Sequence, residues 1–261
     1  MNNLITNFPQ ILEFAKSANL PLEKKRAIIR EYLQTKILTI IYQQPLAKKL
    51  SFVGGTSLRL LRNLNRFSED LDFDNLGLKQ AELNQLISLV NHQLNQENIK
   101  TELVGNKKTD KTFWQLRFPD LLLPLKITSD PREKLMIKID YSSFWEGQKP
   151  QTVLLNHFGF LTYILTNPLD QILIQKLAAY VNRQTIQPRD IYDIVWLYSQ
   201  NAKPDQEFLS KNRLRGLIRL AKTRLSHHPI NQILKRKLVP FLFEANSVNQ
   251  LDLFPIVLHQ L

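Results

Sequence analysis

A glycine turn followed by a pair of aspartates is the part of this chain whose residue types could do chemistry. The stretch Phe52-Val53-Gly54-Gly55-Thr56-Ser57-Leu58-Arg59 precedes Arg66-Phe67-Ser68-Glu69-Asp70-Leu71-Asp72-Phe73. Adjacent glycines let the backbone approach a ligand closely, and the N–H groups at the start of a helix attract phosphate. The first stretch could therefore hold a triphosphate. The residues that we expect to grip it are Gly54, Gly55, Thr56 and Ser57.

The aspartate pair supplies the other half of that chemistry. Asp70 and Asp72 are two residues apart, so on a strand they share one face while Leu71 and Phe73 face the core. Magnesium prefers oxygen ligands and is usually held by carboxylates together with substrate phosphates. Two such ions stabilise both the attacking and the leaving oxygen. Either motif alone is usually an ordinary turn or a solvated strand edge, but their combined order favours nucleotidyl transfer.

A third carboxylate ends an alternating run farther along the chain. Asp140 closes the run from Leu135 to Tyr141, where every second residue faces the same way as Lys138 and Asp140. On a neighbouring strand, Asp140 could lie beside Asp70 and Asp72. Three converging carboxylates repel one another unless cations neutralise them. We therefore expect these aspartates to bind two Mg²⁺ ions, with Mn²⁺ as an alternative.

These motifs resemble the AbiEii/AbiGii-type nucleotidyltransferase toxins, which include the MenT toxins and belong to the polymerase-β-like nucleotidyltransferase superfamily. Besides the glycine turn and the aspartate pair, the resemblance covers Lys138-Ile139-Asp140, then Lys176 with Arg189-Asp190-Ile191-Tyr192-Asp193. The elements occur in family order over roughly residues 50 to 200.

The resemblance implies an α/β (α+β) polymerase-β-like core and a catalytic set. That set is Asp70, Asp72, Asp140, Lys176 and Asp190. It also implies a nucleoside triphosphate substrate, an RNA acceptor such as the tRNA 3′ end, and a separately encoded antitoxin. Judged from the residues alone, Lys176 fits equally well a lysine whose stem covers the core. Asp190 fits equally well a carboxylate that is favourable near a helix start.

Periodicity and turn residues predict the elements that position these motifs. We expect helices over residues 8–18, 21–44, 54–64, 79–96, 167–182 and 188–198. We expect strands over residues 50–53, 70–74, 100–104, 112–118 and 134–141. Asn167-Pro168 is typical of a helix start. We therefore predict a core with an N-terminal helical extension over residues 1–166 and a C-terminal helical domain over residues 167–261.

The chain is strongly basic, with 35 Lys and Arg against 23 Asp and Glu and a net charge of +12. The excess lies mainly after residue 200, and a basic surface there could recruit nucleic acid; the alternative is a solvated helix face. The candidate RNA-binding residues are Arg213, Arg215, Arg219 and Lys222.

Composition narrows the remaining classes of function. Zero cysteines exclude disulfides and thiolate metal sites. No apolar stretch is long enough to span a bilayer, and no secretory signal is visible, so we expect a cytoplasmic protein without a membrane partner. Two alternatives stay open. One is an enzyme of the same fold that modifies a protein hydroxyl. The other is a degenerate nucleotide-binding protein, against which the three intact aspartates argue.

Overall fold

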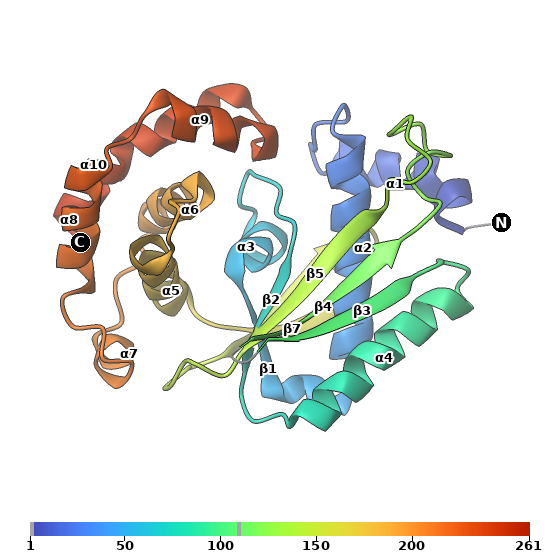
Figure 1. Cartoon of the computed structure of the whole chain (residues 1–261), viewed down its shortest axis with the longest axis horizontal. Helices are drawn as coiled ribbons and strands as arrows, with labels where there is room; N and C mark the ends of the chain where they lie inside the picture. The colour runs from blue at the N-terminus through green and yellow to red at the C-terminus, as the bar shows by residue number, and fades with distance from the viewer. Residues whose placement is uncertain (1–2, 109–110) are drawn as a thin grey trace. The chain divides into compact units, whose positions relative to one another are not determined.

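The computed structural model describes residues 3–108 and 111–261, and the chain folds into two compact units (Figure 1). The first unit comprises Met1–Asn63, Phe67–Ser143 and Thr152–Thr166. The second unit comprises Leu64–Arg66, Phe144–Gln151 and Asn167–Leu261. The chain enters the second unit for the last time after Thr166, where we placed the domain boundary. Two short earlier segments, which the sequence did not single out, also belong to that unit.

A seven-stranded mixed sheet forms the centre of the first unit, in the order β3-β4-β5-β2-β1-β7-β6. The strands are β1 (Leu50–Val53), β2 (Leu71–Asn75), β3 (Glu102–Lys108), β4 (Lys111–Phe118), β5 (Leu135–Ser142), β6 (Gln151–His157) and β7 (Phe160–Thr166). β2 is antiparallel to β1 and parallel to β5. The predicted α/β fold and its first five strands are confirmed, whereas β6 and β7 were not predicted.

Alternation in the sequence becomes alternation in burial on the two strands that carry candidate carboxylates. The apolar residues at odd-numbered positions of β5 are fully buried, whereas Met136 between them is 50% exposed. On β2, Leu71 and Phe73 are buried and Asp72 is partly exposed. Successive side chains of a strand point to opposite faces, so one face of β2 and β5 forms core and the other carries the polar residues. The predicted facing is confirmed for β5 and for Leu71, Asp72 and Phe73 of β2, but not for Asp70, which lies outside β2.

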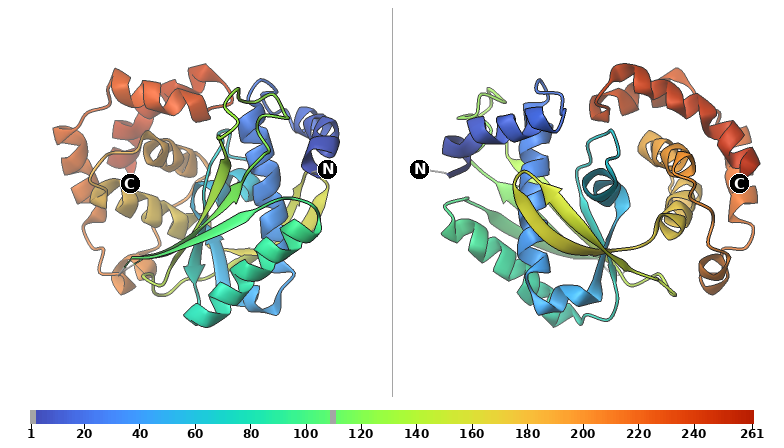
Figure 2. Two further views of the ribbon diagram at one scale, coloured as in Figure 1. Left: turned by 45° about the vertical axis from the view of Figure 1, so that its right-hand side comes forward. Right: turned by 180° about the vertical axis from the view of Figure 1, so that it is seen from behind.

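Four α-helices of the first unit pack around this sheet. They are α1 (Asn3–Ser17), α2 (Lys25–Tyr42), α3 (Gly54–Arg62) and α4 (Gln80–Gln96). α2 packs against α1, α4, β5 and β7, and α3 packs against β1 and β2 (Figure 2). Because α2 is enclosed on nearly all sides, polar residues such as Glu31 are buried together with its apolar residues. Buried polar groups need internal partners.

Two predicted helix starts were wrong. Pro21 was expected in the first turn of the second helix, but α2 begins at Lys25 after the cap residue Lys24. Asn167 was expected to cap the fifth helix, but the cap residue is Pro168 and Asn167 is fully buried. In both cases a good local signal for a helix start lies a few residues before the start that packing selects.

The second unit is helical, as expected for the C-terminal region. Its α-helices are α5 (Leu169–Asn182), α6 (Pro188–Ser199), α7 (Gln206–Lys211), α8 (Leu217–His227), α9 (Gln232–Leu238) and α10 (Phe254–Gln260). Short 3-10 helices are η1 (Pro45–Lys49) in the first unit, and η2 (Val239–Phe241) and η3 (Ala245–Leu253) in the second. α5 and α6 pack together, with α8 against α5 and with α9 and α10 against α6 (Figure 1). Among the described residues, no helix has the length and apolar character needed to cross a membrane.

Candidate active site

The glycine turn places its backbone directly against one of the candidate carboxylates. Gly54 follows β1, begins α3 and has a φ of +78°. A Cβ atom at this position would lie 2.2 Å from Oδ2 of Asp72. The position requires glycine for two reasons, because other residues adopt positive φ only at a cost in free energy and because any side chain would displace the carboxylate. The turn and Asp72 therefore pack as one structure.

A row of paired residues crosses the sheet beside this turn. Asp72 lies opposite Val53 at the end of β1 and, on its other side, next to Asp140 of β5. Asp140 in turn lies opposite Phe113 of β4. Directly paired residues of neighbouring strands point to the same face. The expected position of Asp140 beside Asp72 is confirmed. The row runs from the glycine turn, through two carboxylates, to an aromatic ring.

Asp70 stands just outside this row. β2 begins at Leu71, so Asp70 lies just before the strand. The prediction that Asp70 lies on the strand was wrong. The backbone carbonyl of Asp70 accepts a hydrogen bond of 2.5 Å from Oγ1 of Thr56. Its neighbour Glu69 accepts one of 2.9 Å from Nη1 of Arg30 on α2. Side-chain contacts from two helices thus hold the start of β2 in place.

The hydroxyl groups of the glycine turn are used inside the protein. Thr56 and Ser57 are each 1% exposed. Thr56 donates to Asp70, and Oγ of Ser57 donates to the carbonyl of Gly54 over 3.1 Å. In this structure both hydroxyls stabilise the turn. A grip on phosphate by these residues stays a prediction, for which their backbone N–H groups are the donors at the start of α3.

Lys138 is a charged neighbour of Asp140 to which the sequence gave us no reason to assign a separate role. Its Nζ lies 2.5 Å from Oδ2 of Asp140 and 4.7 Å from the centre of the Phe113 ring. Lys138 and Asp140 are two residues apart on β5 and so share a face. The alternating pattern of β5 would have been enough to find this pair. The carboxylate of Asp140 therefore already has a cationic partner in this structure.

The donor set fits a divalent cation, although the side chains are not arranged around one. Within residues 3–108 and 111–261, no three histidine or acidic side chains lie close enough together to hold a metal ion. The register nevertheless sets Asp72 and Asp140 side by side. The missing Cβ of Gly54 leaves room against the Asp72 carboxylate. Carboxylate oxygens are the ligands that Mg²⁺ prefers, so the residues present are chemically suited to that ion.

Lys176 and Asp190, also predicted as site residues, belong to a buried charge network within the second unit. Nζ of Lys176 lies 3.2 Å from Oδ1 of Asp190 and 2.8 Å from Oδ2 of Asp193. Asp193 also accepts two hydrogen bonds from Arg66, at 2.7 and 2.6 Å. Nη1 of Arg183 lies 3.1 Å from Oδ2 of Asp190, without hydrogen-bond geometry. Lys176, Asp190 and Arg66 thus meet in space, and the sequence did not predict the part played by Arg66.

Attraction outweighs desolvation in this network. Burial by itself raises the pKa of Asp193, but the Arg66 guanidinium and the Lys176 ammonium hold that pKa below its usual value. Burial likewise opposes the charge on Lys176, yet Asp193 and Asp190 raise the pKa of that ammonium above its usual value. Both groups are therefore charged at neutral pH. The network binds α5, α6 and the segment that contains Arg66 together.

A second buried charge cluster lies in the first unit. Glu31 of α2 is 1% exposed and pairs with Nε of Arg59 on α3 at 3.1 Å. Nε2 of His157 on β6 lies 2.7 Å from Oε1 of the same carboxylate. Burial raises the pKa of Glu31, but Arg59 and His157 outweigh it and lower that pKa. The cluster joins α3, which begins with the glycine turn, to α2 and β6.

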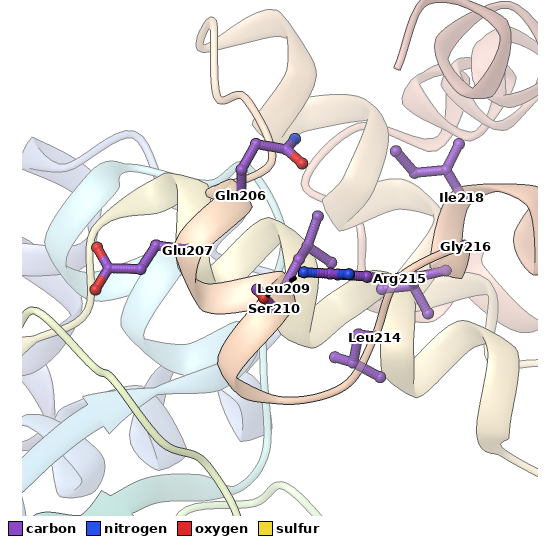
Figure 3. Close-up of a pocket in the computed structure, with 9 residues that line it drawn as sticks. Gln206, Glu207, Leu209, Ser210, Leu214, Arg215, Gly216 and Ile218 are labelled. Carbon is purple, nitrogen blue, oxygen red and sulfur yellow. Dashed lines mark hydrogen bonds between the residues drawn. The ribbon is translucent and has the colours of Figure 1, made fainter.

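The predicted RNA-binding residues lie around the start of α8. Arg219 and Lys222 are exposed on α8. Arg215 donates from Nη2 to Oγ of Ser210 over 3.2 Å. Arg215 also lines an open hollow of about 630 Å³ between α7 and α8 (Figure 3). Arg213 is exposed as well. All four side chains are thus accessible to a partner, and RNA binding by them stays a prediction.

The sequence profile of one protein family matches most of the chain. The family described as "Nucleotidyl transferase AbiEii toxin, Type IV TA system" matches residues 36–249. The chain belongs to the AbiEii nucleotidyl transferase toxin family. The match includes the glycine turn, the three aspartates and the Lys176–Asp190 network, and it confirms the resemblance drawn from the motifs.

Two solved structures from Helicobacter pylori are similar to this chain. The protein JHP933 is 18% identical and aligns over 90% of this chain and 92% of its own length, with a TM-score of 0.48. The same identity and TM-score apply to a protein assigned only provisionally as a nucleotidyltransferase, which aligns over 90% of this chain and 95% of its own length. No curated protein matches the sequence.

Family membership makes this AbiEii protein a nucleotidyltransferase. It implies a nucleoside triphosphate as substrate and an antitoxin as the other half of a toxin–antitoxin system. It does not identify the acceptor or the metal. The geometry of the first unit bears on both.

Proposed function

We propose that this AbiEii protein is a metal-dependent toxin that transfers a nucleoside monophosphate from a nucleoside triphosphate to an RNA acceptor, the 3′ end of tRNA. The observation that carries the proposal is the row in which Gly54 packs against Asp72 and Asp72 lies beside Asp140. A phosphate-binding turn and two adjacent carboxylates on one face are what nucleotidyl transfer needs.

The carboxylates are the proposed metal ligands. Asp72 and Asp140, with Asp70 just before β2, would hold two Mg²⁺ ions, and Mn²⁺ would suit the same oxygen donors. When bound, such ions neutralise the charge that develops on the attacking and leaving oxygens. The glycine turn would orient the triphosphate through the N–H groups of Gly55, Thr56 and Ser57, which lie at the start of α3.

The reaction joins an acceptor hydroxyl oxygen to the α-phosphorus and breaks the bond from that phosphorus to the oxygen that bridges to the β-phosphate. Pyrophosphate leaves, and Asp140 accepts the hydroxyl proton. Catalysis of this kind rests on positioning and on charge neutralisation, not on a covalent intermediate. Lys176 is proposed to offset phosphate charge. Its pairing with Asp190 and Asp193 would hold the ammonium in a defined position until then.

Charge supports RNA as the acceptor. A net charge of +12 suits a polyanionic partner. The proposed contacts outside the catalytic row are Arg213, Arg215, Arg219 and Lys222. A cytoplasmic location follows from the proposed tRNA target.

The test is transfer of label from each α-labelled nucleoside triphosphate to total tRNA in the presence of Mg²⁺. Asp72→Asn and Asp140→Asn should reduce transfer to background, and a chelator should do the same to the unmodified protein. Because Asp72→Asn relieves carboxylate repulsion, its melting temperature should be unchanged or slightly raised. The matched control is Asp130→Asn, an aspartate that pairs only locally with Arg132 on an exposed loop, and it should transfer normally.

The outcomes separate the proposal from its alternatives. Label that appears on protein and not on tRNA would replace the RNA acceptor with a protein hydroxyl. Binding of nucleotide without transfer to either acceptor would indicate a degenerate nucleotide-binding protein. Near-normal transfer by Asp72→Asn would refute the proposed metal site.

A further inference from the structure

The row across the sheet does not end at the carboxylates. Beyond Asp140 lies Phe113 of β4, in direct register and on the same face. Phe113 is only partly buried, and the ammonium of Lys138 lies over its ring. Met136, on the same face of β5, is half exposed. An aromatic ring, a cation and exposed strand surface thus adjoin the Asp140 carboxylate.

The in-line geometry of phosphoryl transfer indicates which substrate binds at the Phe113 end of the row. In phosphoryl transfer the attacking and leaving oxygens lie roughly in line with the phosphorus between them. If the triphosphate is gripped at Gly54, as in the proposed function, pyrophosphate leaves on the Gly54 side of Asp72. The attacking hydroxyl must then come from the opposite side, which is the side of Asp140 and Phe113. Neighbouring strands are about 5 Å apart, so Phe113 is within one nucleotide of the reacting centre.

We propose that Phe113 and Lys138 form the subsite for the 3′-terminal nucleotide of an RNA acceptor. The ring of Phe113 stacks on the terminal base, and Lys138 contacts the phosphate that precedes it. Stacking on aromatic side chains and contacts from cations are how proteins hold single-stranded RNA ends. The inference rests on the proposed function, because the in-line argument needs the triphosphate at Gly54.

The chemistry of the subsite favours RNA over a protein acceptor. A serine or threonine side chain offers no π-face to stack on Phe113, and a peptide offers no phosphate to Lys138. Before the substrate binds, the Lys138 ammonium is paired with the Asp140 carboxylate, because the two groups are 2.5 Å apart. Once Asp140 is otherwise neutralised, the ammonium is free to bind a phosphate within reach of its flexible stem.

The test compares two synthetic RNA hairpins that carry a single-stranded 3′ overhang. One has an intact terminal nucleotide, and the other has an abasic one. Their affinities are measured by fluorescence anisotropy with Mg²⁺ and without nucleoside triphosphate, so no transfer takes place. The unmodified protein should bind the intact end about five- to 150-fold more tightly than the abasic end.

Variants at Phe113 complete a double-mutant cycle. Phe113→Leu should bind both hairpins equally, because the ring that distinguishes them is gone, and Phe113→Tyr should discriminate as the unmodified protein does. Lys138→Met should weaken binding of both hairpins and flatten the salt dependence by about 0.7 per lost phosphate contact. Lys134→Met is its control, because Lys134 pairs with Glu102 and lies six positions before Asp140.

Two results would overturn the subsite. One is equal binding of the two hairpins by the unmodified protein, which would also favour a protein acceptor over RNA. The other is undiminished discrimination by Phe113→Leu. Neither result depends on catalysis. Failure of label transfer to tRNA would refute the proposed function, whereas loss of base discrimination with intact transfer would refute only this inference.

Discussion

Replacing Gly54 with alanine tests whether the glycine turn and Asp72 act as one structure. The added Cβ would lie 2.2 Å from Oδ2 of Asp72. The carboxylate would have to retreat by roughly 1 Å to reach an ordinary contact distance. A misplacement of about 1 Å can reduce the rate of an enzyme about a hundredfold. Transfer to tRNA, measured as kcat/KM, should therefore fall by about a hundredfold or more in Gly54→Ala.

The same substitution has a separate effect on stability. Gly54 has a φ of +78°, and an L-residue in this region costs about 1–2 kcal/mol. Denaturant unfolding should show a loss of about that size. Gly216→Ala is the matched control, because Gly216 has a φ of +86° and a Cβ there would meet nothing closer than 3.9 Å. It should lose similar stability and keep its kcat. The reasoning would be refuted if Gly54→Ala were destabilised and yet transferred at a normal rate.

Three further predictions concern parts of the protein away from Gly54. Asp193→Asn replaces the carboxylate that pairs with the buried Arg66 by a neutral amide. The free energy of unfolding at pH 7 should therefore fall by about 3–5 kcal/mol. Because the pKa of Asp193 is lowered on folding, its stabilisation is full above the ordinary pKa and fades as pH falls through the lowered one. The difference in unfolding free energy between the unmodified protein and Asp193→Asn should therefore shrink below about pH 4. An unchanged difference at pH 3 would contradict the assignment. The control is the exposed Asp252→Asn, which should lower the unfolding free energy by less than about 1 kcal/mol at any pH. Thr56→Val should lower stability by about 1–3 kcal/mol, because the carbonyl of Asp70 loses its buried donor; unchanged stability with impaired use of nucleotide would instead assign the hydroxyl to phosphate binding. Finally, neutralising the four basic residues near α8 together should flatten the plot of log RNA affinity against log salt by about 0.7–0.9 per lost phosphate contact, while nucleotide affinity stays constant; an unchanged slope would make that surface a solvated face. The four residues are Arg213, Arg215, Arg219 and Lys222.

Local patterns in the sequence were sufficient for the elements of the first unit that carry the candidate site. Alternation placed Leu71 and Phe73 in the core, and it put Lys138 and Asp140 on one face of a strand. Both follow from the two-residue period of a strand, which needs no knowledge of its neighbours. The two adjacent glycines similarly indicated a position where the backbone approaches another group closely, and in the structure Gly54 approaches Asp72 in this way. These inferences held because their physical causes act within a few residues.

Other features came only from contacts between distant residues. β6 and β7 were missed although Gly159 marks the turn between them, because short apolar runs do not by themselves distinguish strand from helix. Pro21 and Asn167 are good local signals for a helix start, but tertiary packing places the helix starts later, at Lys25 and Leu169. The pairing of Arg66 with Asp193 joins residues 127 positions apart, and no local period encodes such a distance.

The candidate site shows the same division. The residue types Gly54, Asp72 and Asp140 and their order along the chain were enough to indicate nucleotidyl transfer, because that chemistry depends on carboxylates and a phosphate-binding turn. The tertiary structure decided that Asp72 lies between Gly54 and Asp140, and that Phe113 follows in the same row. Strand order and register decide which residues become neighbours, and these depend on how the whole sheet buries its apolar face.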